Sequence, residues 1–162
     1  MDQSDIKNLP RNTQIMLGAA ILAFIFTLLP FDGVHSHGFG VNRNAWHGFT
    51  GVVGSLLVLA TLLLLLAQTF APRSLPETPA SWNVVAVALS GLAALFFIIR
   101  WISLPSESAF GITISDSLQW GGYILILLCI VITVLAFLRV REAGEPMPWA
   151  QHGGAAPQPP AA

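Results

Sequence analysis

The sequence predicts an all-α membrane protein in which four transmembrane helices form two similar hairpins. Of its 162 residues, 54% are hydrophobic and 9% are charged, whereas soluble domains carry about 25% charged residues. Four uncharged stretches each hold roughly 20 residues or more, the length at which a helix crosses a hydrocarbon core of about 30 Å. Four tryptophans fall at the predicted helix ends, where an indole buries its ring and keeps its N–H hydrated: Trp46, Trp82, Trp101 and Trp120.

The chain divides into a short first segment, a membrane domain and a tail. Residues 1–11 are predicted to be cytoplasmic, residues 12–141 to hold the helices, and residues 142–162, rich in Pro, Ala and Gly, to be disordered and cytoplasmic. The first stretch is expected to be a retained helix and not a signal peptide, because Asp2 and Asp5 precede it and no small-residue cleavage site follows it. The predicted helices cover residues 12–31, 45–70, 82–102 and 117–139.

The distribution of basic residues predicts the orientation. With the N-terminus in the cytoplasm, only Arg43 and Arg100 lie outside, and five basic residues lie inside: Lys7, Arg11, Arg73, Arg139 and Arg141. Because Lys and Arg are enriched in cytoplasmic loops, we expect a multi-pass protein of the cell membrane with both termini in the cytoplasm. The net charge of −1 provides no basic face for nucleic acid, so the expected surroundings are the lipid bilayer.

Short identities between the two halves predict a repeat. Phe39–Val41 and Trp46 in the first half match Phe110–Ile112 and Trp120 in the second, so each half reads as a helix, an outer loop and a helix that opens on Trp. Two spans per half return the chain to the same side, which predicts a pseudo-twofold axis along the membrane normal. We expect this axis to bring the two β-branched loop segments together as a short, two-stranded antiparallel outer lid.

Small residues and capping residues predict how the helices meet and begin. Glycines at 48, 51 and 54 and small residues at 86, 90 and 94 predict that the second and third helices approach closely within the chain. A homodimer through the same residues is the alternative, since both use the same packing of small residues in lipid. Predicted caps for the last three helices are Asn44, Ser81 and the segment "DSLQ" at Asp116–Gln119.

Three histidines lie between the first two helices. His35 and His37 alternate, so on a strand both would face the same side, and Asp32 and His47 complete a nitrogen-and-oxygen set that suits Zn²⁺ or Cu²⁺. Exposed loop histidines without a ligand role are commoner than metal ligands. A pH-responsive loop is a further alternative, because histidine titrates near neutral pH. The metal site is therefore a hypothesis, and no cofactor is predicted.

Arg100 is the charge closest to the membrane. It could bind an anionic ligand or steer a substrate, with Asp116, Glu107 or Asp32 as its ion-pair partner. The favoured alternative is that its side chain snorkels to the outer interface beside Trp101, as long basic side chains do at helix ends.

The sequence does not favour an enzyme or an ion-coupled carrier. No acidic, basic or histidine residue lies in the middle of a predicted span, where proton relays and most ion-coupled carriers hold such residues. No phosphate-binding loop, nucleophile elbow or HExxH zinc motif occurs. The single cysteine, Cys129, excludes an internal disulfide and lies in an apolar run, where packing is its expected role.

Three short motifs carry a resemblance to a known family. They are "LLPF" at Leu28–Phe31, "NAWHGF" at Asn44–Phe49 after a Gly-rich loop, and "LQWGG" at Leu118–Gly122. With these motifs the chain resembles small four-span integral membrane proteins of actinobacteria over residues 12–141. Phe31 stands where those proteins often have Trp, and the histidines of "HSH" fall outside the shared pattern. The resemblance implies a membrane location and a four-span architecture, and no particular activity.

Three functional hypotheses follow. The leading one is a non-enzymatic accessory or scaffold protein that binds another membrane protein, because the apolar surface is large and the outer loops could present a binding face. The runner-up is a binding or transport module for a lipid or apolar small molecule, in a cleft between the hairpins below Arg100. The third is a metal-dependent sensor or enzyme in the outer loop that uses His35 and His37.

Overall fold

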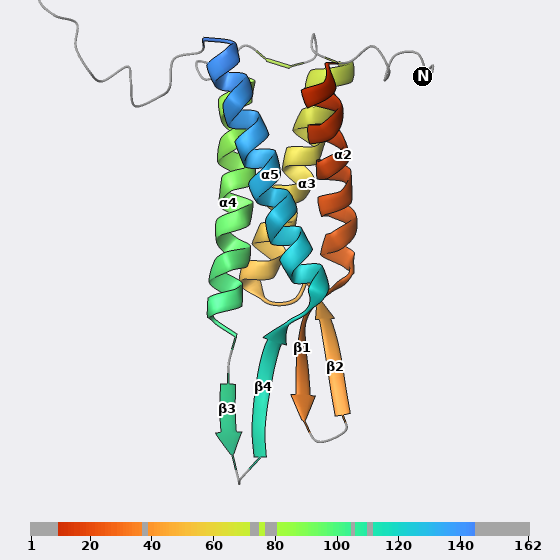
Figure 1. Ribbon diagram of the computed structural model, residues 1–162, viewed down its shortest axis with the longest axis vertical. Helices are drawn as coiled ribbons and strands as arrows, with labels where there is room; N and C mark the ends of the chain where they lie inside the picture. Colours follow the sequence, from red (N-terminus) through yellow and green to blue (C-terminus); the bar gives the residue numbers. More distant parts are fainter. Residues whose placement is uncertain are drawn as a thin grey trace, which may run out of the picture.

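A computed structural model of the chain describes residues 10–36, 39–71, 75–76, 81–104, 106–109 and 112–144. Residues 1–9 and 145–162, which include most of the two predicted cytoplasmic ends, lie outside the described residues. The described part contains four helices and four strands (Figure 1), in the order α2 (Arg11–Leu28), β1 (Pro30–Ser36), β2 (Phe39–Asn44), α3 (Phe49–Phe70), α4 (Trp82–Ile102), β3 (Ser106–Ala109), β4 (Ile112–Leu118) and α5 (Trp120–Glu142).

Each of the four helices is long and apolar enough to cross a membrane, which confirms the four predicted spans. They hold 18 to 23 residues, or about 27 to 35 Å of helix at about 1.5 Å per residue. Large apolar side chains point away from the bundle, with Leu63 and Leu127 57% and 59% exposed. Because soluble monomers do not expose apolar surface on this scale, the helices have the surface of a multi-pass membrane protein.

Five helix limits differ from the predicted ones: α2 begins one residue earlier, at Arg11, α5 extends three residues further, to Glu142, and three limits near the sheet fall short of the prediction. α2 ends at Leu28 because Pro30 begins β1, α3 begins at Phe49, and α5 begins at Trp120. The residues that the prediction added to these helices carry no charge, as in a true span, but they form strands and turns at the end of the bundle. Only α4 has the predicted limits at both ends, Trp82–Ile102.

The four helices close into a ring in which α2 and α4 each contact both α3 and α5 (Figure 1). Small residues allow α3 and α4 to approach each other closely. A Cβ at Gly54 would lie 2.9 Å from two carbons of the Phe97 ring, and Ala86, Ser90 and Ala94 of α4 are buried. The predicted packing of small residues within the chain is therefore confirmed at this contact.

A four-stranded antiparallel sheet in the order β2-β1-β4-β3 stands at one end of the bundle. β1 and β2 form one hairpin, β3 and β4 form the other, and β1 joins the two by pairing with β4. The strands continue in the direction of the helices (Figure 1). One residue separates α2 from β1 and one separates β4 from α5. Since α2 and α5 pack against each other, β1 and β4 leave the bundle side by side.

The predicted two-stranded lid is wrong in extent and in pairing. Phe39–Val41 belongs to the edge strand β2, which pairs with β1 and not with β4, while residues 110–111 lie outside the described residues. The sheet does not confirm the pseudo-twofold axis either. A twofold axis along the bundle maps each strand onto the equivalent strand of the other half without reversing its direction. The two strands at the centre of the sheet would then be equivalent strands, paired in parallel. The central strands here are the unlike, antiparallel β1 and β4.

Of the three predicted caps, Ser81 is confirmed, because its hydroxyl accepts a hydrogen bond from the Val84 amide at 3.3 Å. The other two are wrong, because the sheet takes up their residues. Asn44 ends β2, and Gly48, at φ 72°, precedes α3 in its place. The segment 116–118 lies in β4, and Gln119 precedes α5 without a side-chain capping bond.

Candidate functional site

The first residues of β1 depart from regular strand pairing. The register with β2 shifts between Pro30 and Asp32, so Phe31 has no partner residue on β2. The Phe31 carbonyl accepts a hydrogen bond from the Gln119 amide instead, at 2.8 Å. Successive side chains of a regular strand point to opposite faces. With this irregularity, both Phe31 and Asp32 are buried, at 0% and 3% exposure.

Arg100, in the last turn of α4, is buried against this strand start. Its Nε and Nη2 donate hydrogen bonds to Oδ2 of Asp32 at 3.0 and 2.6 Å. Nη1 also donates to the carbonyls of Ala45, at 2.9 Å, and His47, and Nη2 donates to that of Asn44, at 3.3 Å. A guanidinium has five N–H donors, and these five bonds use all of them within the protein.

Aromatic rings and a glycine complete the surroundings of the guanidinium. The Phe31 ring centroid lies 4.8 Å from Cζ of Arg100, a cation–π distance, and Phe31 packs on Phe97 with ring centroids 5.4 Å apart. A Cβ at Gly51 would collide with Nη1 of Arg100 and the Ala45 carbonyl. The glycine of α3 therefore makes room for a charge, and the C-terminal end of α4 favours a positive one.

Further contacts tie the turn before α3 and the start of α5 to the same place. The Ala45 amide donates to the Thr27 carbonyl at 3.1 Å, and Nε1 of Trp46 donates to the Thr27 hydroxyl at 3.0 Å. A Cβ at Gly122 would lie 2.7 Å from the Phe31 carbonyl oxygen. We call this set of contacting residues the sheet-end junction: Thr27, Phe31, Asp32, Asn44–His47, Arg100 and Gln119–Gly122.

The prediction that Arg100 snorkels to the interface is wrong. Its side chain is 7% exposed, because the sheet and the turn before α3 cover this helix end. It pairs with Asp32, one of the three acids considered; the side chains of Glu107 and Asp116 lie outside the part of the chain that the structure describes. The geometry does not support direct ligand binding by Arg100, since none of its donors is left for a ligand.

An open pocket of about 170 Å³ lies beside the ion pair, between the start of α3 and the end of α4. Asp32 lines this pocket. The Oδ1 atom of Asp32 is buried and has no hydrogen-bond partner among the described residues. This oxygen is enclosed by protein atoms and has less than 1 Å² of exposed surface. The lining of the pocket includes Asp32, His47, Gly48, Thr50, Arg100 and Ser103.

The predicted metal ligands are only partly within the described structure. His37 lies outside it, and the side chain of His35 in β1 is not described either. Oδ2 of Asp32 is bonded to Arg100, and the His47 carbonyl accepts a bond from Arg100. Among the described residues, no three His, Cys, Asp or Glu side chains form a group that could hold a metal ion. The full set of four ligands stays a prediction.

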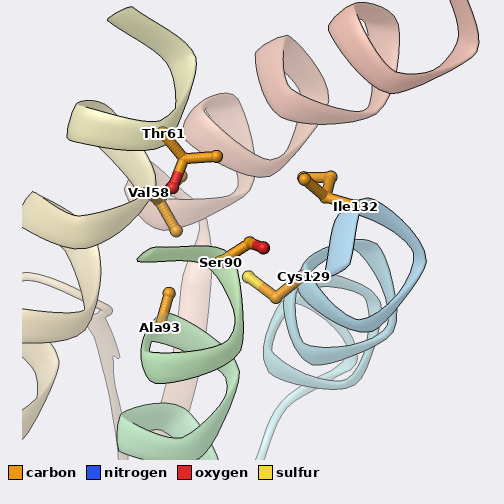
Figure 2. Close-up of a pocket in the computed structure, with 6 residues that line it drawn as sticks. All are labelled: Val58, Thr61, Ser90, Ala93, Cys129 and Ile132. Carbon is orange, nitrogen blue, oxygen red and sulfur yellow. The ribbon is translucent and has the colours of Figure 1, made fainter. Parts of the chain in front are cut away.

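In the middle of the bundle, α3, α4 and α5 enclose a much smaller cavity of about 10 Å³, at the lower limit for one water molecule. The hydroxyls beside it already donate to carbonyls of their own helices, Thr61 to Leu57 at 2.8 Å and Ser90 to Ala86 at 2.7 Å. The cavity is a packing gap, and Cys129, 1% exposed, has a buried packing position there. Figure 2 shows its lining: Val58, Thr61, Ser90, Ala93, Cys129 and Ile132.

The chain matches no protein-family model, no curated protein and no solved structure. The resemblance to four-span actinobacterial proteins therefore stays a prediction, and the function has to be argued from the junction and the sheet.

Proposed function

We propose that this chain is a non-enzymatic accessory or scaffold protein of the cell membrane, which holds a β-sheet at the outer surface and binds another membrane protein through it. The observation that carries the proposal is the junction of Arg100. One side chain on α4 bonds to the start of β1 through Asp32, to the carbonyl of the last residue of β2, and to two carbonyls of the turn before α3. These bonds fix the sheet relative to the bundle, as a rigid binding platform requires.

The proposed orientation places the sheet outside and both termini in the cytoplasm. Arg139 and Arg141 lie in the last turn of α5, and Arg11 begins α2, all at the end opposite the sheet. Two basic residues lie at the sheet end, Arg43 in β2 and Arg100 in the last turn of α4. The excess of basic residues at the opposite end supports the cytoplasmic assignment of that end.

The proposed binding surface is the free edge of β2. β2 ends the sheet on one side, so one edge of its backbone has no strand beside it within the described residues. Val41, in the middle of β2, is 62% exposed. An exposed strand edge is a template for an added strand from a partner, whose main-chain hydrogen bonds supply the affinity.

Native mass spectrometry of the tagged protein, extracted in mild detergent from its own host membranes, tests the proposal. We expect a stoichiometric protein partner on the natural chain. Val41→Lys should reduce the bound partner by about tenfold or more, because a charge on an edge strand opposes strand addition.

The matched control is Ala143→Lys, which adds the same charge to an exposed residue at the opposite end. It should retain the partner. A bare monomer or homodimer, or equal loss of the partner in both variants, would contradict the proposal.

A further inference from the structure

The two free edges of the sheet lie at different distances from the bundle. β2 ends the sheet on one side and β3 ends it on the other. The register places four residues in one row across the sheet: Gly40 of β2, His35 of β1, Ser115 of β4 and Ser106 of β3. β3 begins at this row and runs away from the bundle, whereas all of β2 except Phe39 lies at this row or closer to the bundle (Figure 1). The two edges therefore overlap over only two residues.

The free edge of β2 begins at the end of the bundle. The Ala45 amide, directly after β2, donates a hydrogen bond at 3.1 Å to the carbonyl of Thr27 in the last turn of α2. β2 has six residues, which is about 20 Å of strand at about 3.3 Å per residue. Residues 40–42 and 44 of this strand are exposed. A partner that covers this edge must therefore have a segment close to the membrane surface.

The orientation of the sheet restricts the direction of an added strand. β1 follows α2 and runs away from the bundle, and β2 returns toward it (Figure 1). The pairings in the sheet are all antiparallel, and antiparallel pairs outnumber parallel ones about two- to threefold in proteins. A strand added antiparallel to β2 starts at the membrane surface and runs away from it. A span directed toward the sheet side supplies such a strand, as α2 supplies β1 with one residue between them.

A second copy of this chain does not fit the edge of β2. Copies with the same orientation in a membrane are related by rotation about the membrane normal, which does not reverse the direction of a strand. β2 of one copy would therefore pair with β2 of another in parallel. β3 of another copy runs antiparallel to β2, but at the same height it would meet only the two residues of β2 farthest from the bundle. Residues 41–44, the part of the edge nearest the membrane, would stay uncovered.

We propose that the partner of β2 is a different membrane protein, in which a span directed toward the sheet side continues into a strand that adds antiparallel to β2. The inference rests on the proposed binding at the β2 edge and specifies the kind of partner that binds there. Main-chain hydrogen bonds between the two strands supply the affinity. The added strand then lies on the free side of β2 as β1 lies on its paired side, and each of these two strands follows a span.

Photo-cross-linking of the full chain in its own host membranes tests the proposal. The photoreactive residue p-benzoylphenylalanine is placed at Gly40 in one variant and at Asn44 in another, since both positions are exposed and lie about 13 Å apart along β2. We expect both variants to cross-link one segment of one membrane protein, identified by mass spectrometry of the cross-linked peptides. The residue reached from Asn44 should lie next to the end of a span. The residue reached from Gly40 should lie about four residues later in the sequence.

Three outcomes would overturn the proposal. The reverse order of the two cross-linked residues would show a strand parallel to β2. A cross-linked segment in a protein without a span, or far from any span, would show a partner that reaches the edge from the aqueous side. Cross-links between isotope-labelled and unlabelled copies of this chain would show a second copy. As a control, the photoreactive residue at Ala143, exposed at the opposite end of the bundle, should not reach the same segment.

Failure of this inference is distinguishable from failure of the proposed function. A partner that the natural chain retains and Val41→Lys loses, but whose cross-links show one of these three outcomes, would contradict only the direction and origin of the added strand. A retained partner that neither β2 position cross-links would place the binding surface away from β2 and overturn the inference. If the natural chain retains no partner, the proposed function is wrong, and the inference that rests on it is wrong as well.

Discussion

Arg100 and Ser90 lie on the same helix about three turns apart, yet their surroundings differ in kind. At the sheet end, α4 meets a carboxylate and three backbone carbonyls through one guanidinium. In the middle, it meets small and aliphatic side chains, and its contact with α5 includes one hydroxyl pair, Thr133 to Ser90 at 3.0 Å.

The comparison shows two ways to join helices in a membrane. The helix contacts in the middle of the bundle depend on shape and on weak hydrogen bonds, and one of these bonds can be lost without affecting the others. The junction depends on charge, and a buried charge that loses its partner is expensive. Mutations of matched chemistry in the two regions should therefore differ in their effect on the free energy of unfolding.

Arg100→Met should have the largest effect. It leaves Asp32 buried without a counter-charge and three carbonyls without a donor, so we expect a loss of about 3–5 kcal/mol in the free energy of unfolding. Unfolding of the purified protein in mixed detergent micelles measures this value. The double variant Asp32→Leu with Arg100→Met should lose less than the sum of the single variants. A loss below about 1 kcal/mol in the free energy of unfolding of Arg100→Met would mean that the ion pair of Asp32 and Arg100 contributes no more than an exposed pair.

Gly51→Ala should be the next most harmful, because its Cβ would collide with Arg100 and the Ala45 carbonyl. We expect a loss of about 1–3 kcal/mol, measured in the same way. Gly91→Ala is the matched control in the middle of α4, since its nearest neighbour would be Cγ2 of Thr133 at 3.6 Å, an ordinary contact. It should change stability by no more than about 0.5 kcal/mol. Equal costs for the two glycines would remove the distinction between the regions.

Trp46→Phe keeps most of the ring and removes the indole donor to the Thr27 hydroxyl. Because Thr27 is fully buried, we expect a loss of about 1 kcal/mol. Trp82→Phe removes a comparable bond, to the Pro76 carbonyl at 3.1 Å, at an exposed place beyond the opposite end of the bundle. Water replaces that bond, so the melting temperature of Trp82→Phe should stay nearer to that of the natural chain. The reverse order would contradict the assignment of the buried bond to the junction.

Thr133→Val should have the smallest effect. It removes the interhelical bond to Ser90 and the bond to the Cys129 carbonyl on its own helix, and such interhelical bonds contribute about 0.6 kcal/mol on average in membrane proteins. Thr61→Val, whose hydroxyl bonds only to its own helix through Leu57, is the control and should cost less. A loss above about 2 kcal/mol for Thr133→Val would place a strong polar contact in the middle of the bundle as well.

Much of the architecture follows from sequence because it depends on local composition. Length and the absence of charge located all four spans, and the spacing of Gly51 and Gly54 indicated the close contact of α3 with α4. The Ser81 cap could also be predicted from the sequence, since it depends on a hydrogen bond from the amide three residues further along. The sequence also offers Asp32 as a partner for Arg100, because it is an acid near the end of the first span.

The sheet and the junction were decided by tertiary structure. Residues 29–31, 45–48 and 117–119 lack charge like the spans beside them, and only the folded chain shows that they form strand ends and turns and not helix. The irregular start of β1 buries three successive residues, Phe31, Asp32 and Gly33, which no alternating pattern predicts. Arg100 at a helix end looks exposed in sequence, because the strand and turn that cover it are 53 to 68 residues away. Sequence sets what each segment can be, whereas the meeting of distant segments determines which charges are removed from water.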